Sequence, residues 1–223
     1  MALAESLSAQ LHARHADLMR TELEAVALRL FESDGIADVT VERIAAEAGI
    51  SVRTFYRYFP TKDDVLQVRI ERRSEALAEA LARCPADVVT MRAIRDAFAA
   101  TARTEDPELV RRWIAVVATA PSAVKGVLGG IQLKSHPVVA AFVAERIGQD
   151  AGSLVPTMVA AAVGGVVQAV HTDWYLNGGD LPTAIAEGLA VLEAGLDPDS
   201  PTWSARRSAK TRAKAADPRA RRA

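Results

Sequence analysis

Apolar side chains recur at helical spacing along most of this chain, and strand signals are nearly absent. Leu23, Ala27, Leu30 and Phe31 lie at i, i+4, i+7 and i+8, which places them on one face of an amphipathic helix. Alternating apolar and polar residues, and the Asn-Gly or Asp-Gly turns of hairpins, are rare. We therefore expect an all-α protein.

Glycine, proline and capping residues divide this pattern into separate helices. The first ends near Asp34 and Gly35, and two short helices follow over 41–48 and 52–58, with Thr40 and Ser51 as N-caps. Thr61 and Asp64 resemble a capping box, which predicts the start of a long helix that runs to about residue 83. Further helices are expected over 88–104, 107–119, 154–176 and 181–194, and the glycines and proline of 121–148 leave that stretch ambiguous.

The two short helices, joined by a tight turn after a longer helix, have the organisation of a helix-turn-helix. Ala45 lies where the short helices would cross, and Gly49 lies in the turn, where a positive φ favours glycine. The small core beneath them is expected to contain Ile44, Ile50, Phe55 and Phe59.

The second short helix leaves polar and aromatic side chains on its outer face, and Lys62 follows it. Arginine and threonine side chains contact base edges or phosphates, and tyrosine hydroxyls bind phosphates. This pattern occurs as plain packing in other helical proteins, but the basic residues among the aromatic ones favour DNA binding. The outward residues are Arg53, Thr54, Tyr56, Arg57 and Tyr58.

Residues 31–66, and above all the run Thr-Phe-Tyr-Arg-Tyr-Phe-Pro-Thr-Lys of 54–62, closely resemble the TetR family of bacterial regulators. The resemblance implies a homodimer, a helical effector-binding C-terminal domain, and repression of transcription that a small molecule relieves. Carried over by position, Arg53, Thr54 and Tyr56 would face bases or adjoining phosphates, and Tyr58 and Lys62 would bind phosphates.

The first short helix has a smaller expected share in DNA binding. By the same resemblance, Thr40 would lie at the DNA backbone, and Arg43 would add a contact. Glu42, beside them, departs from the pattern, because a cation would be more useful there.

The fold expected is all-α, with an N-terminal three-helix domain that a long helix joins to a helical ligand-binding and dimerisation domain. We expect a disordered arm over 1–16, the DNA-binding domain over 17–62, the effector and dimerisation domain over 63–197, and a basic disordered tail over 198–223. Small residues in 159–170 allow close helix approach, which suits either the domain core or a two-fold helix bundle between subunits. The resemblance implies dimerisation through the last two long helices, so 154–176 and 181–194 are the candidates for the dimer interface.

The formal net charge of −1 hides an asymmetry. From Trp203 onward eight basic residues accompany one acidic residue, whereas the rest of the chain has 19 basic and 27 acidic residues. An acidic body does not attract DNA at long range, so local geometry must supply the DNA contact. The basic tail could add non-specific phosphate contacts, and a solubilising role is slightly favoured.

Several large side chains fall in the later helices and could line a pocket for a small hydrophobic effector, although each is also an ordinary core residue. No set of residues has the spacing of a metal site, a catalytic centre or a cofactor loop. The pocket candidates are Met91, Phe98, Trp113, Phe142, Met158, His171 and Trp174.

The single cysteine, Cys84, excludes an internal disulfide framework and fits a reducing compartment. We expect no secretory signal and no membrane span, hence a cytoplasmic regulator rather than an enzyme, with no cofactor. The predicted partners are a palindromic DNA operator in double-stranded form, a small hydrophobic effector and a second copy of the chain. The alternative is a sensor of the same fold that acts through protein partners or activates transcription.

Overall fold

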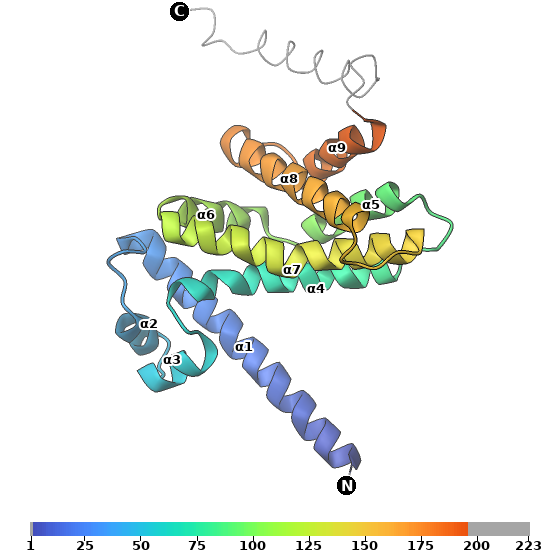
Figure 1. Cartoon of the computed structure of the whole chain (residues 1–223). Coiled ribbons are helices and arrows are strands. Elements are labelled where there is room, and N and C mark those ends of the chain that lie inside the picture. Colours follow the sequence, from blue (N-terminus) through green and yellow to red (C-terminus); the bar gives the residue numbers. More distant parts are fainter. Residues whose placement is uncertain (1, 196–223) are drawn as a thin grey trace, which may run out of the picture. The chain divides into compact units, whose positions relative to one another are not determined.

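The computed structural model describes residues 2–195, with side chains from Arg14 onward, and every regular element in this part of the chain is a helix (Figure 1). The prediction of an all-α protein is confirmed; the predicted tail of 198–223 lies outside the described residues. The elements are α1 (Ala2–Asp34), α2 (Val41–Glu47), α3 (Val52–Tyr58), the 3-10 helix η1 (Asp63–Leu66), α4 (Gln67–Ala82), α5 (Thr90–Arg103), α6 (Pro107–Ala118), α7 (Pro121–Ile147), α8 (Leu154–Asn177) and α9 (Leu181–Ala194).

The caps and turn predicted around the short helices are present. The hydroxyl of Thr40 accepts a hydrogen bond from the Arg43 N–H at 3.3 Å, and that of Ser51 accepts one from the Thr54 N–H at 3.0 Å. Gly49 has a φ of +67°, in the left-handed region where a side chain is strained. These local interactions fix where α2 and α3 begin and how the chain turns between them.

Only one of the two bonds of the capping box predicted at Thr61 and Asp64 is present. The N–H and the hydroxyl of Thr61 both donate to the Asp64 carboxylate, at 2.8 and 2.7 Å. The bond from the Thr61 N–H to Asp64 is the one that the third residue of a capping box accepts, but no helix N–H among the described residues donates to the Thr61 hydroxyl. The chain passes through η1 first, and the α-helix proper begins at Gln67.

Two long helices also differ from the prediction. The helix α1 begins at Ala2, so residues 2–16 are helical rather than a disordered arm. The ambiguous stretch is one continuous helix, α7, with Pro137 inside it. One of its glycines, Gly130, lies close to α4, because a Cβ there would overlap the end of the Gln67 side chain, whereas nothing lies near Gly129.

The described residues form two compact units. The first contains the residues up to Ala76 together with Glu105–Val138, and the second contains Leu77–Thr104 together with the residues from Val139 onward. This division does not follow the boundary expected at residue 62, because Val65 and Leu66 of η1 are fully buried in the core that α1, α2 and α3 share.

In the second unit, α9 packs against both α5 and α8 (Figure 1). Ile94, Ile185 and Leu189 are fully buried there. Gly188 allows close approach, because a methyl group at this position would lie 2.6 Å from Val170 Cγ2 and 3.2 Å from Val166 Cγ1.

By length and hydropathy alone α7 and α8 could each cross a membrane, with mean hydropathies of 1.3 and 1.6. This is weak evidence, because the core helices of soluble proteins pass the same test.

Replacing Gly188 with alanine tests the packing of α9 on α8. The added methyl would meet two β-branched side chains that have few alternative rotamers, so we expect Gly188→Ala to lower the free energy of unfolding by about 1–3 kcal/mol. Gly129→Ala is the control, because nothing lies within 4 Å of its methyl position. It should raise stability by up to about 1 kcal/mol through helix propensity. Urea unfolding followed by circular dichroism measures both, and equal effects of the two variants would contradict the packing argument.

Candidate nucleic-acid interface

The helix-turn-helix rests on α1 through a small apolar core. Ala45 is 1% exposed, and the chain turns immediately after α2 with a hydrogen bond of 2.9 Å from the Ile50 N–H to the Ala45 carbonyl. Phe55 and Phe59 are buried with their rings 5.6 Å apart, and Ile44 is buried beside them. As the sequence predicted, this core leaves the opposite side of α3 facing solvent.

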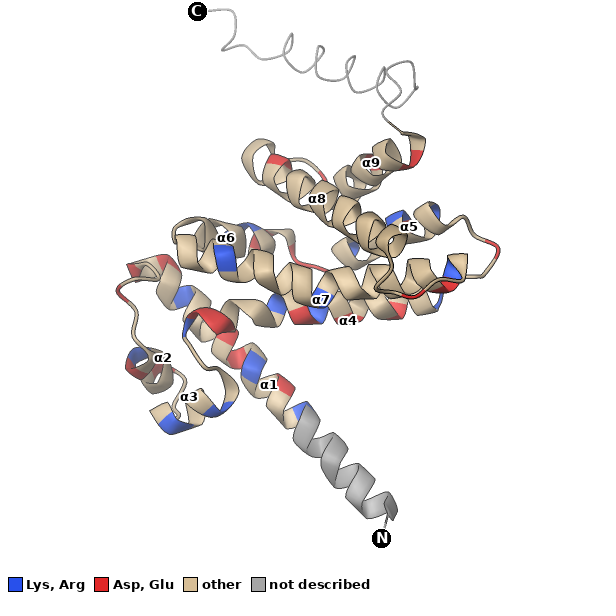
Figure 2. Cartoon of the chain, in the orientation of Figure 1, with Lys and Arg blue, Asp and Glu red and all other residues tan. Residues whose placement is uncertain are grey.

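The outer face of α3 is basic and free of acidic residues. Figure 2 shows only basic colouring on α3, whereas α2 has charges of both signs. Arg53 and Arg57 are exposed, and the Tyr56 side chain is 53% exposed. Among the described residues Arg53 makes no hydrogen bond or ion pair, so its guanidinium has all five donors free for an acceptor outside the chain.

Arg57 and Tyr58 form a pair at the end of α3. The guanidinium of Arg57 donates to the Tyr58 hydroxyl at 3.0 Å and lies 4.9 Å from the centre of its ring. The tyrosine oxygen accepts this bond and keeps its own proton, so it can still donate to a phosphate.

The hydroxyls of Thr54 and Thr40 already take part in hydrogen bonds at the starts of α3 and α2. The hydroxyls of Thr54 and Ser51 lie 2.8 Å apart. The Glu42 carboxylate accepts from its own N–H and from the Thr40 hydroxyl, and these bonds lower the pKa of Glu42. The Glu42 carboxylate is therefore bonded within the first turn of α2, to its own N–H and to the N-cap residue Thr40.

Arg43 turns toward α1 rather than away from it. Its guanidinium lies 2.6 Å from the carboxylate of Asp34, at the end of α1. A DNA contact by Arg43 would compete with this ion pair, so its share in DNA binding is smaller than that of Arg53.

Lys62 has a role that sequence analysis missed. Its ammonium donates to the backbone carbonyls of Ile36, Ala37 and Val39, the last two at 3.2 and 2.7 Å. An ammonium has three donors, so all of them are used to hold the connection between α1 and α2. The acceptors precede Lys62 by 23 to 26 residues, and no local pattern could have indicated them.

Two known protein families match this chain. Residues 24–68 match the family described as bacterial regulatory proteins of the tetR family. Residues 85–197, half of the chain, match the family described as the MftR C-terminal domain. The chain belongs to the TetR family. It is therefore a helix-turn-helix transcriptional regulator of a family that binds DNA and small-molecule effectors, typically as dimers.

Two curated TetR-family relatives align over most of the chain. MftR of Mycobacterium tuberculosis, whose name assigns it to mycofactocin biosynthesis, is 27% identical over 77% of this chain and 88% of its own length. The HTH-type transcriptional regulator TcmR of Streptomyces glaucescens is 30% identical over 71% of this chain and 74% of its own length. The solved Thermus thermophilus FadR, a TetR family repressor in complex with lauroyl-CoA, shares the fold with a TM-score of 0.51 at 20% identity, over 82% of this chain and 97% of that one.

The candidate effector residues fall in both compact units. Trp113 lies in the first unit, in the same core cluster as Phe31 and Phe55. The other six candidates lie in the second unit, so the seven are not shown to line one pocket. Among the described residues, no group of three His, Cys, Asp or Glu side chains could hold a metal ion.

Within the second unit the six candidates differ in their surroundings. Phe98 and Phe142 are buried, and Met91 is half-buried. Trp174 is 2% exposed, and its ring N–H donates to the Gly179 carbonyl at 2.9 Å, which stabilises the turn after α8. The side chain of Met158 is 58% exposed on α8. His171 Nδ1 lies 2.7 Å from the Val167 carbonyl, one helical turn earlier.

Replacing Lys62 with methionine tests its role in the TetR-family helix-turn-helix. Methionine keeps an apolar stem but removes the ammonium, so we expect Lys62→Met to lower the free energy of unfolding by about 1–3 kcal/mol through the lost charge-assisted bonds. Arg53→Met is the matched control, and it should change stability by less than about 0.5 kcal/mol because its side chain is exposed. If Lys62→Met kept full stability in urea but lost DNA affinity, Lys62 would be a phosphate contact instead.

Proposed function

We propose that this TetR-family chain is a cytoplasmic, dimeric repressor that inserts α3 into the major groove of an operator and leaves it when a small hydrophobic effector binds. The main support for this proposal is the outer face of α3. Burial of Phe55 and Phe59 fixes the orientation of the helix, while Arg53 and Tyr56 remain exposed. In helix-turn-helix proteins the second helix reads base edges, and two-fold dimers bind half-sites about one helical turn apart.

The proposed division of labour follows from what each side chain already contacts. Arg53, without a partner among the described residues, is assigned to base edges, and Tyr56 and Tyr58 to phosphates. We assign Lys62 to positioning rather than to direct contact, because its donors are occupied. Residues 17–62 form the proposed DNA-binding domain, and 63–197 the proposed effector and dimerisation domain.

A hydrophobic effector is supported by the buried aromatic residues of the second unit and by the family. FadR of Thermus thermophilus, which shares the fold, was solved with lauroyl-CoA. An effector acts by binding more tightly to a conformation in which the paired α3 helices no longer match the groove spacing. Phe98, Phe142 and Met91 are the pocket residues that we propose from the second unit.

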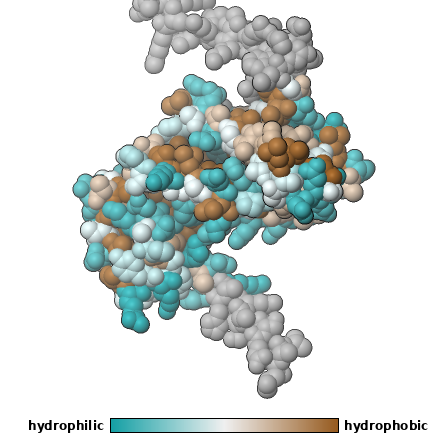
Figure 3. Space-filling view, in the orientation of Figure 1, coloured by the Kyte–Doolittle hydropathy of each residue, from teal (hydrophilic) through white to brown (hydrophobic). Residues whose placement is uncertain are grey.

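The dimer interface that we propose is the outer face of α8, with α9 beside it. Leu154 and Met158 are 72% and 58% exposed, and Ala161, Ala162, Gly165 and Ala169 continue the same face at helical spacing. Figure 3 shows hydrophobic side chains gathered over α8. A large exposed apolar face of small residues favours close helix packing between two copies.

Charge substitution on α8 tests the dimer. Met158→Asp would place two carboxylates in an apolar two-fold interface, so we expect a largely monomeric protein at micromolar concentration by analytical ultracentrifugation. Val89→Asp is the matched control, because Val89 is also 58% exposed but lies at the start of α5. A dimer that survives Met158→Asp would exclude this face of α8.

Alanine substitutions on α3 test the DNA contact. We expect Arg53→Ala to cost about 1–3 kcal/mol at one base position, and Tyr56→Ala to weaken binding across all sequences. Gel mobility shifts with the promoter DNA beside its own gene measure both. Arg92→Ala is the control, because Arg92 is exposed on α5, which belongs to the other compact unit.

Wild-type affinity in both α3 variants would overturn the assignment of this face. A uniform loss for Arg53→Ala would mark it as a phosphate contact instead. A folded protein that binds no DNA would favour the alternative in which the chain acts through protein partners.

A further inference from the structure

One carboxylate of the first compact unit binds cations from two other helices. Glu71 lies on α4, and its side chain is 24% exposed. One of its oxygens accepts a hydrogen bond from the guanidinium of Arg20 on α1. The other oxygen lies 3.3 Å from the ammonium of Lys134 on α7. A single side chain therefore connects α1, α4 and α7, and all three residues belong to the same compact unit.

Arg20 extends this connection to the end of α3. Its guanidinium carbon lies 5.4 Å from the centre of the Phe59 ring, which is within the range of a cation–π interaction. Phe59 follows α3 as its C-cap residue and is 1% exposed, with its ring 5.6 Å from that of Phe55. The carboxylate of Glu71 thus holds a cation against one of the two rings that orient α3.

The side of α4 that carries Glu71 faces α7. Gln67, Glu71 and Ser74 lie at i, i+4 and i+7, on one face of the helix. A Cβ at Gly130 of α7 would overlap the end of the Gln67 side chain, and the hydroxyls of Ser74 and Ser135 lie 2.8 Å apart. The ion pair with Lys134 lies between these two contacts along α4, so Glu71 is fixed against α7 from both sides.

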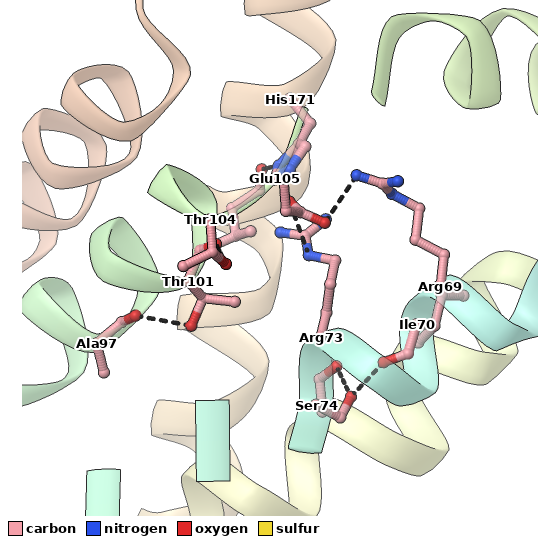
Figure 4. Close-up of polar contacts among 11 residues, drawn as sticks. Arg69, Ile70, Arg73, Ser74, Ala97, Thr101, Thr104, Glu105 and His171 are labelled. Carbon is pink, nitrogen blue, oxygen red and sulfur yellow. Dashed lines mark hydrogen bonds and ion pairs between the residues drawn. The ribbon is translucent and has the colours of Figure 1, made fainter. Parts of the chain in front are cut away.

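A different side of α4 has its own charged pairs. Figure 4 shows Arg69 and Arg73 directed at Glu105, with Ser74 outside this group. Arg69 donates to Glu105 at 2.7 Å, and Arg73 Nε lies 3.6 Å from the other oxygen of that carboxylate. Neither arginine contacts Glu71 through a hydrogen bond or an ion pair among the described residues. A substitution at Glu71 therefore leaves these pairs in place and reports on the connection to α1 and α7.

We propose that Glu71 is a positioning residue for DNA binding, which relates the orientation of α3 to α7 through Arg20 and Phe59. Without the carboxylate, Arg20 loses its acceptor, and its partly exposed guanidinium turns from the ring toward water. The seven-residue α3 then loses one of the contacts that hold it. This inference rests on the proposed DNA contact of α3, and it assigns a role in that contact to residues that do not touch DNA.

Hydrogen–deuterium exchange of the full-length, DNA-free protein tests the link to α3. Glu71→Gln keeps the size of the side chain and removes its charge, so we expect the amides of α3 to exchange about threefold to fivefold faster. Glu79→Gln is the matched control, because Glu79 lies on the same helix, is 72% exposed and pairs with Arg83 four residues later. Unchanged exchange in α3, or the same acceleration in α6 as in α3, would overturn the proposal.

Lys134 provides a test that a general structural role would not pass. We expect Lys134→Met alone to accelerate exchange in α3 about twofold, and to have no effect once Glu71→Gln is present, because the lysine acts through that carboxylate. Lys125→Met is the control, because Lys125 is exposed on the same helix and makes no ion pair among the described residues. Additive effects of Lys134→Met and Glu71→Gln would contradict the link between α7 and α3.

Operator affinity is measured separately, by mobility shifts at several salt concentrations. Glu71→Gln should weaken binding about threefold to fivefold and leave the slope of log K against log salt unchanged, because it removes no phosphate contact. A changed slope, or full affinity despite faster exchange in α3, would overturn the role of Glu71 in DNA binding. If the unsubstituted protein binds no DNA, the proposed function fails, and the exchange data still decide whether Glu71 holds α3.

Discussion

The burial of Phe55 and Phe59 against α1 determines which side of α3 faces solvent. With seven residues, α3 is too short to be a stable helix in isolation, so its form depends on this packing and on the Ser51 cap. Because both rings are fully buried, α3 cannot rotate without exposing them. Arg53 and Tyr56 therefore keep a fixed direction relative to α1 and the start of α4, which bury the two rings.

The segment from Lys62 to Arg69, which leads into α4, contacts the rest of the first unit in three ways. Lys62 holds the carbonyls after α1, and Val65 and Leu66 lie in the same core as Phe55. Arg69 then meets Glu105 beyond that core. The compact unit accordingly extends past residue 62 and includes α6.

The sequence was sufficient to predict the ends of α2 and α3, because the deciding interactions there are local. Thr40, Ser51 and Gly49 set the ends of α2 and α3 through bonds and dihedrals within a few residues, and all three were predicted. Helical periodicity indicates that a face is buried but not what covers it, so it could not place Trp113 in the core of the first unit. The tasks of Lys62 and of the Arg69–Glu105 pair depend on partners 23 to 36 residues away, which only the folded chain brings together.

The net charge of the chain limits how the outer face of α3 could recognise DNA. The chain before Trp203 has eight more acidic than basic residues, and on α2 both Glu42 and Arg43 are occupied within the protein. Long-range attraction of this part of the chain to DNA is therefore weak, and the proposed binding depends on a few close contacts from α3. Close contacts fail when the distance between two recognition helices changes by a small amount. For the dimer proposed above, a modest conformational shift would therefore be enough to release DNA, whereas a strongly basic protein would stay bound non-specifically.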